Sequence, residues 1–430
     1  MAPDGTEFTA RRPPESLGDG LALRSARPED LEAIVALEVA AFGASDEPGV
    51  RAHLATEAAL GDWAVVTAPP RSTSGGPDRI VSSSSLIHHR MALDGVEFDA
   101  GQIEYVATDP AYQRQGLVRA QFAWHHQRAT DRGDLALFIG GIPYLYRRFG
   151  YGYGLDYPAV RVPPNLDASL HPDLDIRLAT DADQPAIRAL DHRRPTTGLR
   201  VVRNDEAWAV INATSHANAW EQLWVAYRGD HLAAWFRTQR KPEDGRVYLP
   251  TAAVGDHEPA STTLALIAHA RAVAGTDTLI VWDIADSRFS THLEELPELG
   301  PSLRHDHAIY VRVPDPVALL DALRPALSER FATSRYATRD GELVLSFYDS
   351  AVALDLAGGQ VTGVRDVPRV EDPSGGAGIG IAPDWFGALV FGRFGAIGLA
   401  ARADDVTLGR ARGLMEALFP ARPADVVGEF

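Results

Sequence analysis

The chain has 430 residues, of which 45% are hydrophobic and 23% charged, with a formal net charge of -17. This length exceeds what one hydrophobic core normally serves, so we expect two or three domains. The absence of cysteine excludes disulfides, thiolate zinc sites and a cysteine nucleophile. The negative charge disfavours nonspecific binding to nucleic acid and favours cationic ligands, unless it serves only solubility.

Residues 1–20 contain Arg11-Arg12-Pro13-Pro14 and carry no periodic apolar face, so we expect a flexible arm. The N-terminus lacks the apolar core of a secretion signal, and no run in the chain reaches the roughly 18 apolar residues that span a bilayer. We therefore expect a cytoplasmic protein without a membrane span.

The first elements predicted after the arm are a strand from Leu23 and a helix that begins near Pro28. Strands are predicted over 63–68 and 80–87, and Asp94-Gly95 is typical of a hairpin turn. These signals indicate an antiparallel meander.

A strand over 103–107, a glycine-containing loop and a helix come next. The helix is predicted from Leu117 to Asp131 because its apolar residues recur at helical spacing, and Gly133 is placed to end it. Residues 135–139 then return as a strand.

An internal repeat indicates a duplicated domain, unless two alanine-rich helix starts merely look alike. Residues 23–37 recur as 176–190, and the identical pairs are Arg24 and Arg177, Ala26 and Ala179, Asp30 and Asp183, Ala33 and Ala186, Ile34 and Ile187, Ala36 and Ala189, and Leu37 and Leu190. In the second copy, a strand over 247–249 is followed by a loop over 251–259 with one glycine, two acids and no arginine. That loop could not cradle a diphosphate, so we expect a catalytically empty copy.

After Pro314 the pattern changes to a third, mixed domain. A helix is predicted over 317–323, strands over 343–347, 352–356 and 359–363, and a final helix over 406–419.

The segment Gln113-Arg114-Gln115-Gly116-Leu117-Val118 lies between the predicted strand over 103–107 and its following helix. Backbone N–H groups at a helix N-terminus, helped by the helix dipole, bind phosphate groups well. Gly116 permits close approach and Arg114 adds a positive charge. The segment therefore predicts a diphosphate site, the alternative being an ordinary turn.

Two longer motifs resemble a known family: Val106-Ala-Thr-Asp-Pro-Ala-Tyr-Gln-Arg-Gln-Gly-Leu-Val118 and Tyr146-Arg-Arg-Phe-Gly-Tyr-Gly152. They are similar to the GNAT superfamily of N-acetyltransferases, and to its Eis (enhanced intracellular survival) branch over nearly the whole chain. The resemblance implies an α/β (mixed α+β) fold with two tandem GNAT-like domains, the second degenerate, and a domain resembling sterol carrier protein. The boundaries would be 21–158, 159–312 and 313–430, and family members assemble as hexamers.

The same resemblance implies acetyl-CoA as co-substrate and no metal. It assigns the pantetheine arm to Val106, Ala107 and Thr108, and the region beside the thioester to Gly141 and Ile142, where this chain lacks a Ser-Glu pair that the family often has. The residues implied around the diphosphate are Arg114, Gln115, Gly116, Leu117, Val118 and Arg119.

Acetyl transfer to an amine needs one group to give a proton to the departing thiolate and another to take one from the amine. Tyr146 suits the first role, since a phenol with a pKa of about 10 is protonated at neutral pH; aromatic packing is the alternative. The resemblance implies the terminal carboxylate of Phe430 for the second role, the alternative being a frayed tail. The adjacent histidines His88 and His89, like His125 and His126, diverge and receive no role.

The predicted function is direct acetyl transfer from acetyl-CoA to a primary amine. The resemblance extends to relatives that acetylate aminoglycosides and lysine-containing peptides, so a cationic small molecule, including a polyamine, or a lysine side chain is the expected acceptor. A non-catalytic protein that senses CoA, or that binds an apolar ligand in its third domain, is the alternative.

Overall fold

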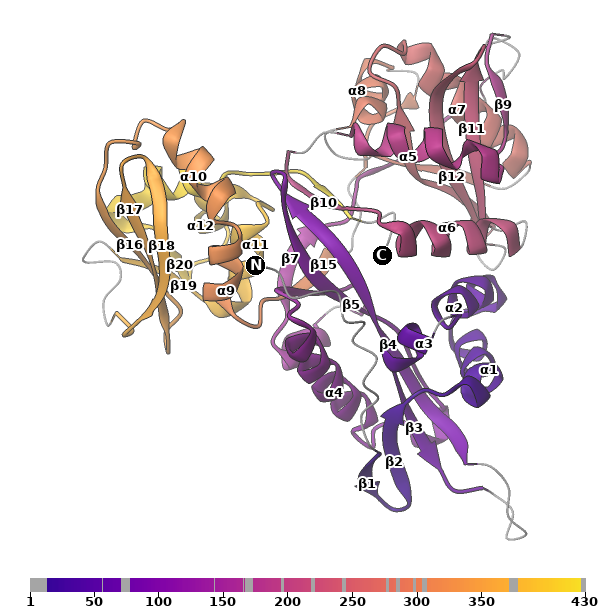
Figure 1. Ribbon diagram of the computed structural model, residues 1–430, viewed down its shortest axis with the longest axis horizontal. Coiled ribbons are helices and arrows are strands. Elements are labelled where there is room, and N and C mark those ends of the chain that lie inside the picture. The colour runs from indigo at the N-terminus through magenta and orange to yellow at the C-terminus, as the bar shows by residue number, and fades with distance from the viewer. Residues whose placement is uncertain are drawn as a thin grey trace.

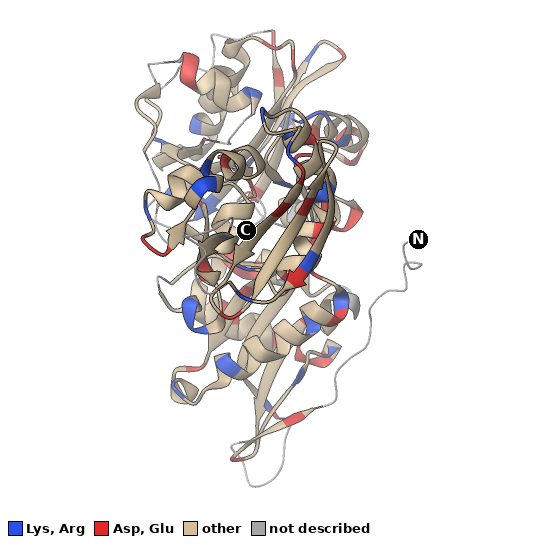
Figure 2. Ribbon diagram, turned by 90° about the vertical axis from the view of Figure 1, so that its left-hand side faces the viewer, with Lys and Arg blue, Asp and Glu red and all other residues tan. Residues whose placement is uncertain are grey.

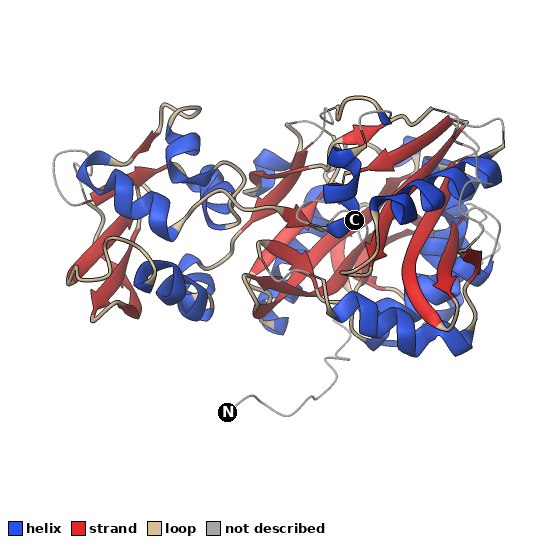
Figure 3. Ribbon diagram, turned by 90° about the horizontal axis from the view of Figure 1, so that it is seen from above, coloured by secondary structure: helices blue, strands red, loops and turns tan. Residues whose placement is uncertain are grey.

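The computed structural model describes residues 14–55, 57–70, 78–142, 144–164, 166, 173–194, 197–217, 221–241, 245–275, 278–283, 287–296, 299–303, 308–370 and 378–426. They form three β-sheets with helices packed around them (Figure 1). Seen from above, the unit built on the third sheet lies to one side, and the other two units lie close together (Figure 3). The predicted mixed α/β class with several units is confirmed.

The first sheet has ten strands in the order β1-β2-β3-β4-β5-β6-β15-β7, with β10 beside β4 and β21 beside β10. They are β1 (Glu15–Gly18), β2 (Leu21–Ser25), β3 (Trp63–Ala68), β4 (Arg79–Leu93), β5 (Val96–Thr108), β6 (Ala136–Ile139), β7 (Gly152–Asp156), β10 (Leu199–Val201), β15 (Ala308–Arg312) and β21 (Ala424–Asp425). Its helices are α1 (Leu31–Phe42), α2 (Glu47–His53), α3 (Glu57–Gly61) and α4 (Leu117–Arg132). Neighbours from β1 to β5 are antiparallel, whereas β5 and β6 are parallel because α4 connects them.

Glycines and one aspartate set the local turns as the sequence predicts. Asp94 and Gly95 have φ values of 46° and 81°, which give the hairpin between β4 and β5. Gly116 precedes α4 and Gly133 ends it, both in the left-handed conformation. The predicted hairpin and helix are confirmed.

Two predictions at the edges of the first unit are wrong. The arm expected over 1–20 includes β1, which pairs with β2 to form a short hairpin, because Gly18 and Gly20 allow the tight turn between them; residues 1–13 lie outside the described residues. The boundary expected at residue 312 separates β15 from the sheet to which it belongs, since β15 pairs with both β6 and β7. Residues 308–312 directly follow the second unit in the sequence, so their pairing with strands of the first unit could not be recognised from the sequence.

The second sheet has six strands in the order β8-β14-β13-β12-β11-β9. They are β8 (Val160–Arg161), β9 (Asp175–Leu178), β11 (Glu221–Arg228), β12 (His231–Lys241), β13 (Arg246–Val254) and β14 (Thr278–Trp282). Its helices are α5 (Gln184–His192), α6 (Asp205–Ala217), α7 (Ala260–Ala274) and α8 (Arg288–Glu295). An antiparallel run from β9 to β13 is followed by a parallel pair joined through α7, which repeats the order of β2 to β6.

The repeated segments share their local structure as well as their sequence. Arg24 donates two hydrogen bonds to Asp30, of 2.5 and 2.9 Å, between β2 and α1. Arg177 donates two to Asp183, both of 2.8 Å, between β9 and α5. The same bidentate pair in the same strand-to-helix connection supports a duplication of one ancestral unit.

The second copy differs where the first has its glycine loop. β13 continues to Val254, so the loop predicted over 251–259 is shortened to 255–259. In this loop the buried carboxylate of Glu258 accepts hydrogen bonds from Arg228 (3.1 Å) and from Thr262 in α7 (2.8 Å). A negative charge of the chain itself thus occupies the start of α7, which disfavours an anionic ligand there.

The third sheet has five strands in the order β18-β17-β16-β19-β20. They are β16 (Gly341–Ser346), β17 (Ala351–Ala357), β18 (Gln360–Val367), β19 (Gly378–Ile381) and β20 (Val406–Thr407), and the helices are α9 (Pro316–Ala322), α10 (Arg324–Ala332), α11 (Phe386–Val390), α12 (Gly395–Ala400) and α13 (Arg412–Leu418). The three strands predicted between 343 and 363 are confirmed. The helix predicted over 406–419 is wrong in its first half, because β20 pairs with β19 there.

One hydrophobic core joins the third unit to the first sheet. Phe391, which follows α11, is buried against Phe98 of β5 and Phe138 of β6, with ring centroids 6.0 and 5.7 Å apart. Gly152 of β7 lies directly against the backbone of Asp384. The third unit is therefore a tightly packed neighbour of the first sheet.

Asp94 also ties the units together, from the tip of the β4–β5 hairpin. Its carboxylate accepts hydrogen bonds from the Gly198 backbone (2.7 Å), Arg330 of α10 (2.8 Å) and Arg422 (3.2 Å). Burial favours the neutral acid, but the charge of Arg330 and these hydrogen bonds hold the pKa of Asp94 below its usual value.

Replacing Gly152 with alanine should destabilise the protein by about 1–3 kcal/mol, because the added methyl group would overlap the carbonyl oxygen of Asp384. Gly398→Ala is a matched control, since a methyl group at that position in α12 meets its nearest neighbour at 3.4 Å. Urea unfolding of both variants would measure the difference. Equal unfolding free energies for the two would contradict the close packing at Gly152.

Candidate functional site

The two central parallel strands of the first sheet separate partway along their length. β5 pairs with β6 from Ala100 to Gln102, and this pairing ends opposite Phe138. Tyr105 has a φ of 54°, and the register of β5 against β4 shifts beside it. Within the described strands, the rest of β5 therefore has β4 as its one neighbour, and its other edge is open to a ligand.

Three residues that were predicted to bind the pantetheine arm lie on this open part of β5. Val106 and Thr108 are half-buried, and Ala107 is buried. The Thr108 hydroxyl is 2.8 Å from the hydroxyl of Ser82 on β4. Peptide groups along such an edge can hydrogen-bond an extended amide-bearing chain as a further strand would.

The predicted diphosphate loop leads directly from β5 into α4. Asp109 fixes its first turn by accepting from the Ala111 backbone (2.9 Å). Arg114, Gln115 and Gly116 are exposed, and a side-chain carbon on Gly116 would meet no atom within 4 Å. The φ of 65° at Arg114 and 82° at Gly116 curls the backbone ahead of the 16-residue helix. The first N–H groups of α4 have no partner within the helix, and the loop beside them is exposed, which fits a diphosphate.

The remaining loop residues divide between surface and core. Arg119 is exposed, so its charge is available to a ligand. Leu117 is buried and Val118 half-buried against the core, so these two can offer a ligand only backbone groups.

Tyr146 is buried close to Gly141 and Ile142. Its hydroxyl is 3.2 Å from where a side-chain carbon on Gly141 would lie, and its ring stacks on Phe122 of α4 at 5.9 Å. Burial, with the negative charge of Glu104, raises the pKa of Tyr146 to about 12, although the Ile142 backbone opposes this shift. The phenol is thus a proton donor over the whole physiological range.

Tyr310 supports this region and was missed by the sequence analysis. From β15 its hydroxyl accepts a hydrogen bond from the Tyr144 backbone N–H (2.5 Å) and donates to the hydroxyl of Tyr153 (2.8 Å). Its ring meets that of Tyr146 edge-on at 5.4 Å. Its sequence context is an ordinary apolar strand that gives no signal of this role.

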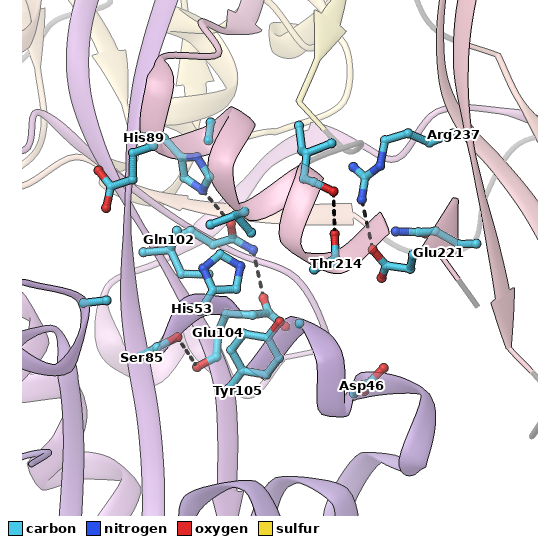
Figure 4. A pocket seen from close by; sticks show the side chains of 18 of the residues that line it. Asp46, His53, Ser85, His89, Gln102, Glu104, Tyr105, Thr214, Glu221 and Arg237 are labelled. Carbon is cyan, nitrogen blue, oxygen red and sulfur yellow. Dashed lines mark hydrogen bonds and ion pairs between the residues drawn. The ribbon is translucent and has the colours of Figure 1, made fainter. Parts of the chain in front are cut away.

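A cavity of about 500 Å³ lies between the first and second units (Figure 4). Its walls come from α2, β4 and β5 on one side and from α6, β11 and β12 on the other. None of the predicted site residues lines it, but Glu104 does, two positions before Val106. A charged residue inside an apolar strand was the sequence signal that could have singled out Glu104.

Glu104 belongs to a chain of hydrogen bonds on the cavity wall. Its carboxylate accepts from Gln102 (2.9 Å), whose carbonyl oxygen is 2.7 Å from His89. Burial raises the pKa of Glu104. The negative charge of Glu104 contributes to the raised pKa of Tyr146, so the cavity and the Tyr146 site are electrostatically coupled.

The four histidines set aside in the sequence analysis are hydrogen-bonded in the structure. Their partners are Asp99 for His88, Gln102 for His89, Ser84 for His125 and Tyr151 for His126. In the part of the chain that the structure describes, no group of three or more His, Asp or Glu side chains is arranged to hold a metal ion. No described helix is both long enough and apolar enough to cross a membrane.

Residues 22–154 match the family model described as an acetyltransferase (GNAT) domain. These residues form a GNAT acetyltransferase domain. They include the open edge of β5, the glycine loop and Tyr146.

The similar proteins cover the chain to different extents. The N-acetyltransferase Eis of Mycobacterium bovis is 33% identical over 93 residues, which are 21% of this chain and 22% of that protein. The matched stretch thus spans about a fifth of that relative. The solved structure of a GCN5-related N-acetyltransferase from Kribbella flavida is 15% identical with a TM-score of 0.63, over 94% of this chain and 97% of that one. Eis1 from Mycobacterium abscessus is 14% identical with a TM-score of 0.60, over 95% and 100%.

These two structures share the fold of nearly the whole chain. The arrangement of its three units is therefore found in other proteins, and the GNAT resemblance is confirmed for the first of them. Acetyltransferases of this domain family use acetyl-CoA, and the exposed loop and open strand edge described above fit that molecule.

Glu38 gives the stability of the folded protein a testable pH dependence. This carboxylate on α1 is fully buried, accepts from Ser83 (2.5 Å), and its Oε2 has no hydrogen-bond partner among the described residues. Burial raises its pKa from 4.5 to about 8, although the bond from Ser83 opposes the shift. The folded protein keeps a proton that the unfolded chain releases above about pH 4.5, so stability is lost as pH rises toward 8.

Glu38→Gln should remove this loss, because the amide has no proton to release. We expect the unfolding free energy of the variant to vary less than that of the native protein between pH 5 and 8, measured by urea unfolding. Glu32→Gln, on the exposed face of the same helix, is the control. The same pH dependence in Glu38→Gln and the native chain would contradict a protonated Glu38.

Proposed function

We propose that this chain is an acetyl-CoA-dependent N-acetyltransferase that transfers acetyl directly to a primary amine. The observation that carries the proposal is the GNAT domain over residues 22–154, with Tyr146 buried beside Gly141 and within the electrostatic influence of a cavity carboxylate. Acetyl-CoA supplies the activated acetyl thioester. The acceptor is the amine of a cationic small molecule, aminoglycoside-like or a polyamine, or of a lysine side chain.

The chain would hold acetyl-CoA along the open edge of β5 and at the start of α4. Val106, Ala107 and Thr108 provide backbone groups for the pantetheine arm. The free N–H groups from Gly116 to Arg119 and the charges of Arg114 and Arg119 suit the diphosphate. Gly141 and Ile142, next to Tyr146, would border the thioester.

Tyr146 would supply a proton from its hydroxyl to the leaving sulfur. Its ring packs between Phe122 and Tyr310, which holds the phenol oxygen in place. A pKa of about 12 keeps the proton available at neutral pH. Tyr310 acts as a positioning residue, since it binds the backbone of Tyr144 in the same turn.

The terminal carboxylate of Phe430 would take the proton from the amine. Phe430 lies outside the described residues. The preceding segment is held in place: β21 pairs with β10, Asp425 forms an ion pair with Arg194, and Arg422 bonds to Asp94. These contacts of residues 422–425 support the proposal.

A domain boundary near residue 158, a sterol-carrier-protein-like third unit, a cytoplasmic location and a hexameric assembly complete the proposal. The boundary, the kind of third unit and the assembly rest on the resemblance to Eis proteins.

Tyr146→Phe should lower kcat about 100-fold or more and leave KM for acetyl-CoA nearly unchanged, because it removes the proton and keeps the ring packing. Release of CoA with a panel of polyamines and aminoglycosides would measure both constants. Tyr144→Phe is the control, since Tyr144 is 68% exposed. Unchanged kcat in Tyr146→Phe would eliminate the phenol as proton donor.

Two alanines added after Phe430 should abolish most of the activity, because the carboxylate would be displaced from the amine. Phe430→Ala keeps a terminal carboxylate at the same position and should retain more activity than the extended chain. The same CoA-release assay compares them. Full activity in the extended protein would exclude the terminal carboxylate as base.

A further inference from the structure

The cavity between the first and second units carries opposite charges at its two sides. Glu104 and Asp46 line it from the first unit, and Arg240 and Lys241 line it from the end of β12. Three further acids line the cavity: Asp62 is paired with Arg128 and Arg132, Glu221 is paired with Arg237 at 3.2 Å, and Glu206 at the start of α6 is exposed on the side of the second unit. Figure 4 shows Glu104 and Asp46 on one side and the Glu221–Arg237 pair on the other.

The acidic side of the cavity contains groups that suit a bound cation. Glu104 has one carboxylate oxygen fixed by Gln102, which orients the group. Beside it the ring of Tyr105 stacks on Trp63 with centroids 5.4 Å apart, and His53 lies 5.8 Å away. A carboxylate next to an aromatic wall suits an ammonium group that is attached to an apolar stem.

The basic side contains a residue that occurs once in the chain. Lys241 is the single lysine in the sequence, the other cationic side chains being arginine and histidine. It is exposed, and its charge lowers the pKa of Glu104, against the larger effect of burial, so the two groups act across the same cavity. Arg240 beside it is held by a bond to the carbonyl of Ala274 (3.1 Å). The flexible side chain of Lys241 allows its ammonium group to contact an anion in several orientations.

We propose that this cavity is the acceptor site and that it takes a zwitterionic amine, whose ammonium binds Glu104 and whose anionic group faces Lys241 and Arg240. The inference rests on the proposed function and narrows its acceptor. A second ammonium at the far end would meet Lys241, so a diamine fits less well. The overall charge of -17 points to cationic acceptors, whereas the charges inside the cavity favour an acceptor that carries both a positive and a negative group.

Three amines of matched chain length test the proposal: 6-aminohexanoate, hexylamine and 1,6-diaminohexane. With saturating acetyl-CoA, kcat/KM should be highest for 6-aminohexanoate, exceeding that of the diamine by about tenfold. Lys241→Gln should bring the two values close together. Arg246→Gln is the matched control, because Arg246 is the exposed register neighbour of Lys241 and does not line the cavity.

Glu104→Gln should raise KM for all three amines and leave KM for acetyl-CoA unchanged, a division that a general loss of structure would not give. A preference for the diamine that Lys241→Gln leaves unaltered would overturn the inference, while turnover of any amine would uphold the proposed function.

Calorimetric binding of the three amines separates the two proposals further. Tight binding of 6-aminohexanoate that both variants weaken, without turnover, would support the site and refute the transferase. No binding and no turnover of 6-aminohexanoate would refute the zwitterion site.

Discussion

The separation of β5 from β6 after Gln102 and Phe138 is the constraint on which the site depends. If β5 and β6 stayed paired beyond these residues, the peptide groups of Val106 and Thr108 would be hydrogen-bonded within the sheet. The shift of register at Tyr105 instead turns β5 away, which opens its edge and brings Glu104 to the cavity. In the proposed function, this one irregular strand offers backbone groups to acetyl-CoA and the Glu104 carboxylate to the acceptor.

The rest of the chain supplies the remaining walls and supports of the site. The second unit supplies the far wall of the cavity, and β15 supplies the tyrosine that braces the turn before Tyr146. The third unit packs on the same sheet through Phe391 and donates Arg330 to Asp94. Glu258 occupies the start of α7 in the second copy and disfavours an anionic ligand there, whereas the loop before α4 in the first copy is exposed.

Local signals in the sequence were sufficient for the local structure. Gly116, Gly133 and the Asp94-Gly95 pair dictate their own backbone conformations, and the motif around them identified the GNAT domain. Glu104 and Tyr310 could not be placed in the same way, because their roles depend on partners more than 100 residues distant, such as the β12 wall and the Tyr144 turn. The edge strands β1 and β20 were missed because short strands carry little periodicity.

The position of β15 has a consequence for how the protein is made. The chain emerges from the ribosome N-terminus first, so β6 and β7 exist long before residues 308–312 arrive to pair with both. Until then the acetyltransferase sheet has a gap, with two unpaired strand edges and an unfilled place for Tyr310. The second unit can complete its own sheet during that interval, so it can finish folding before the first unit does.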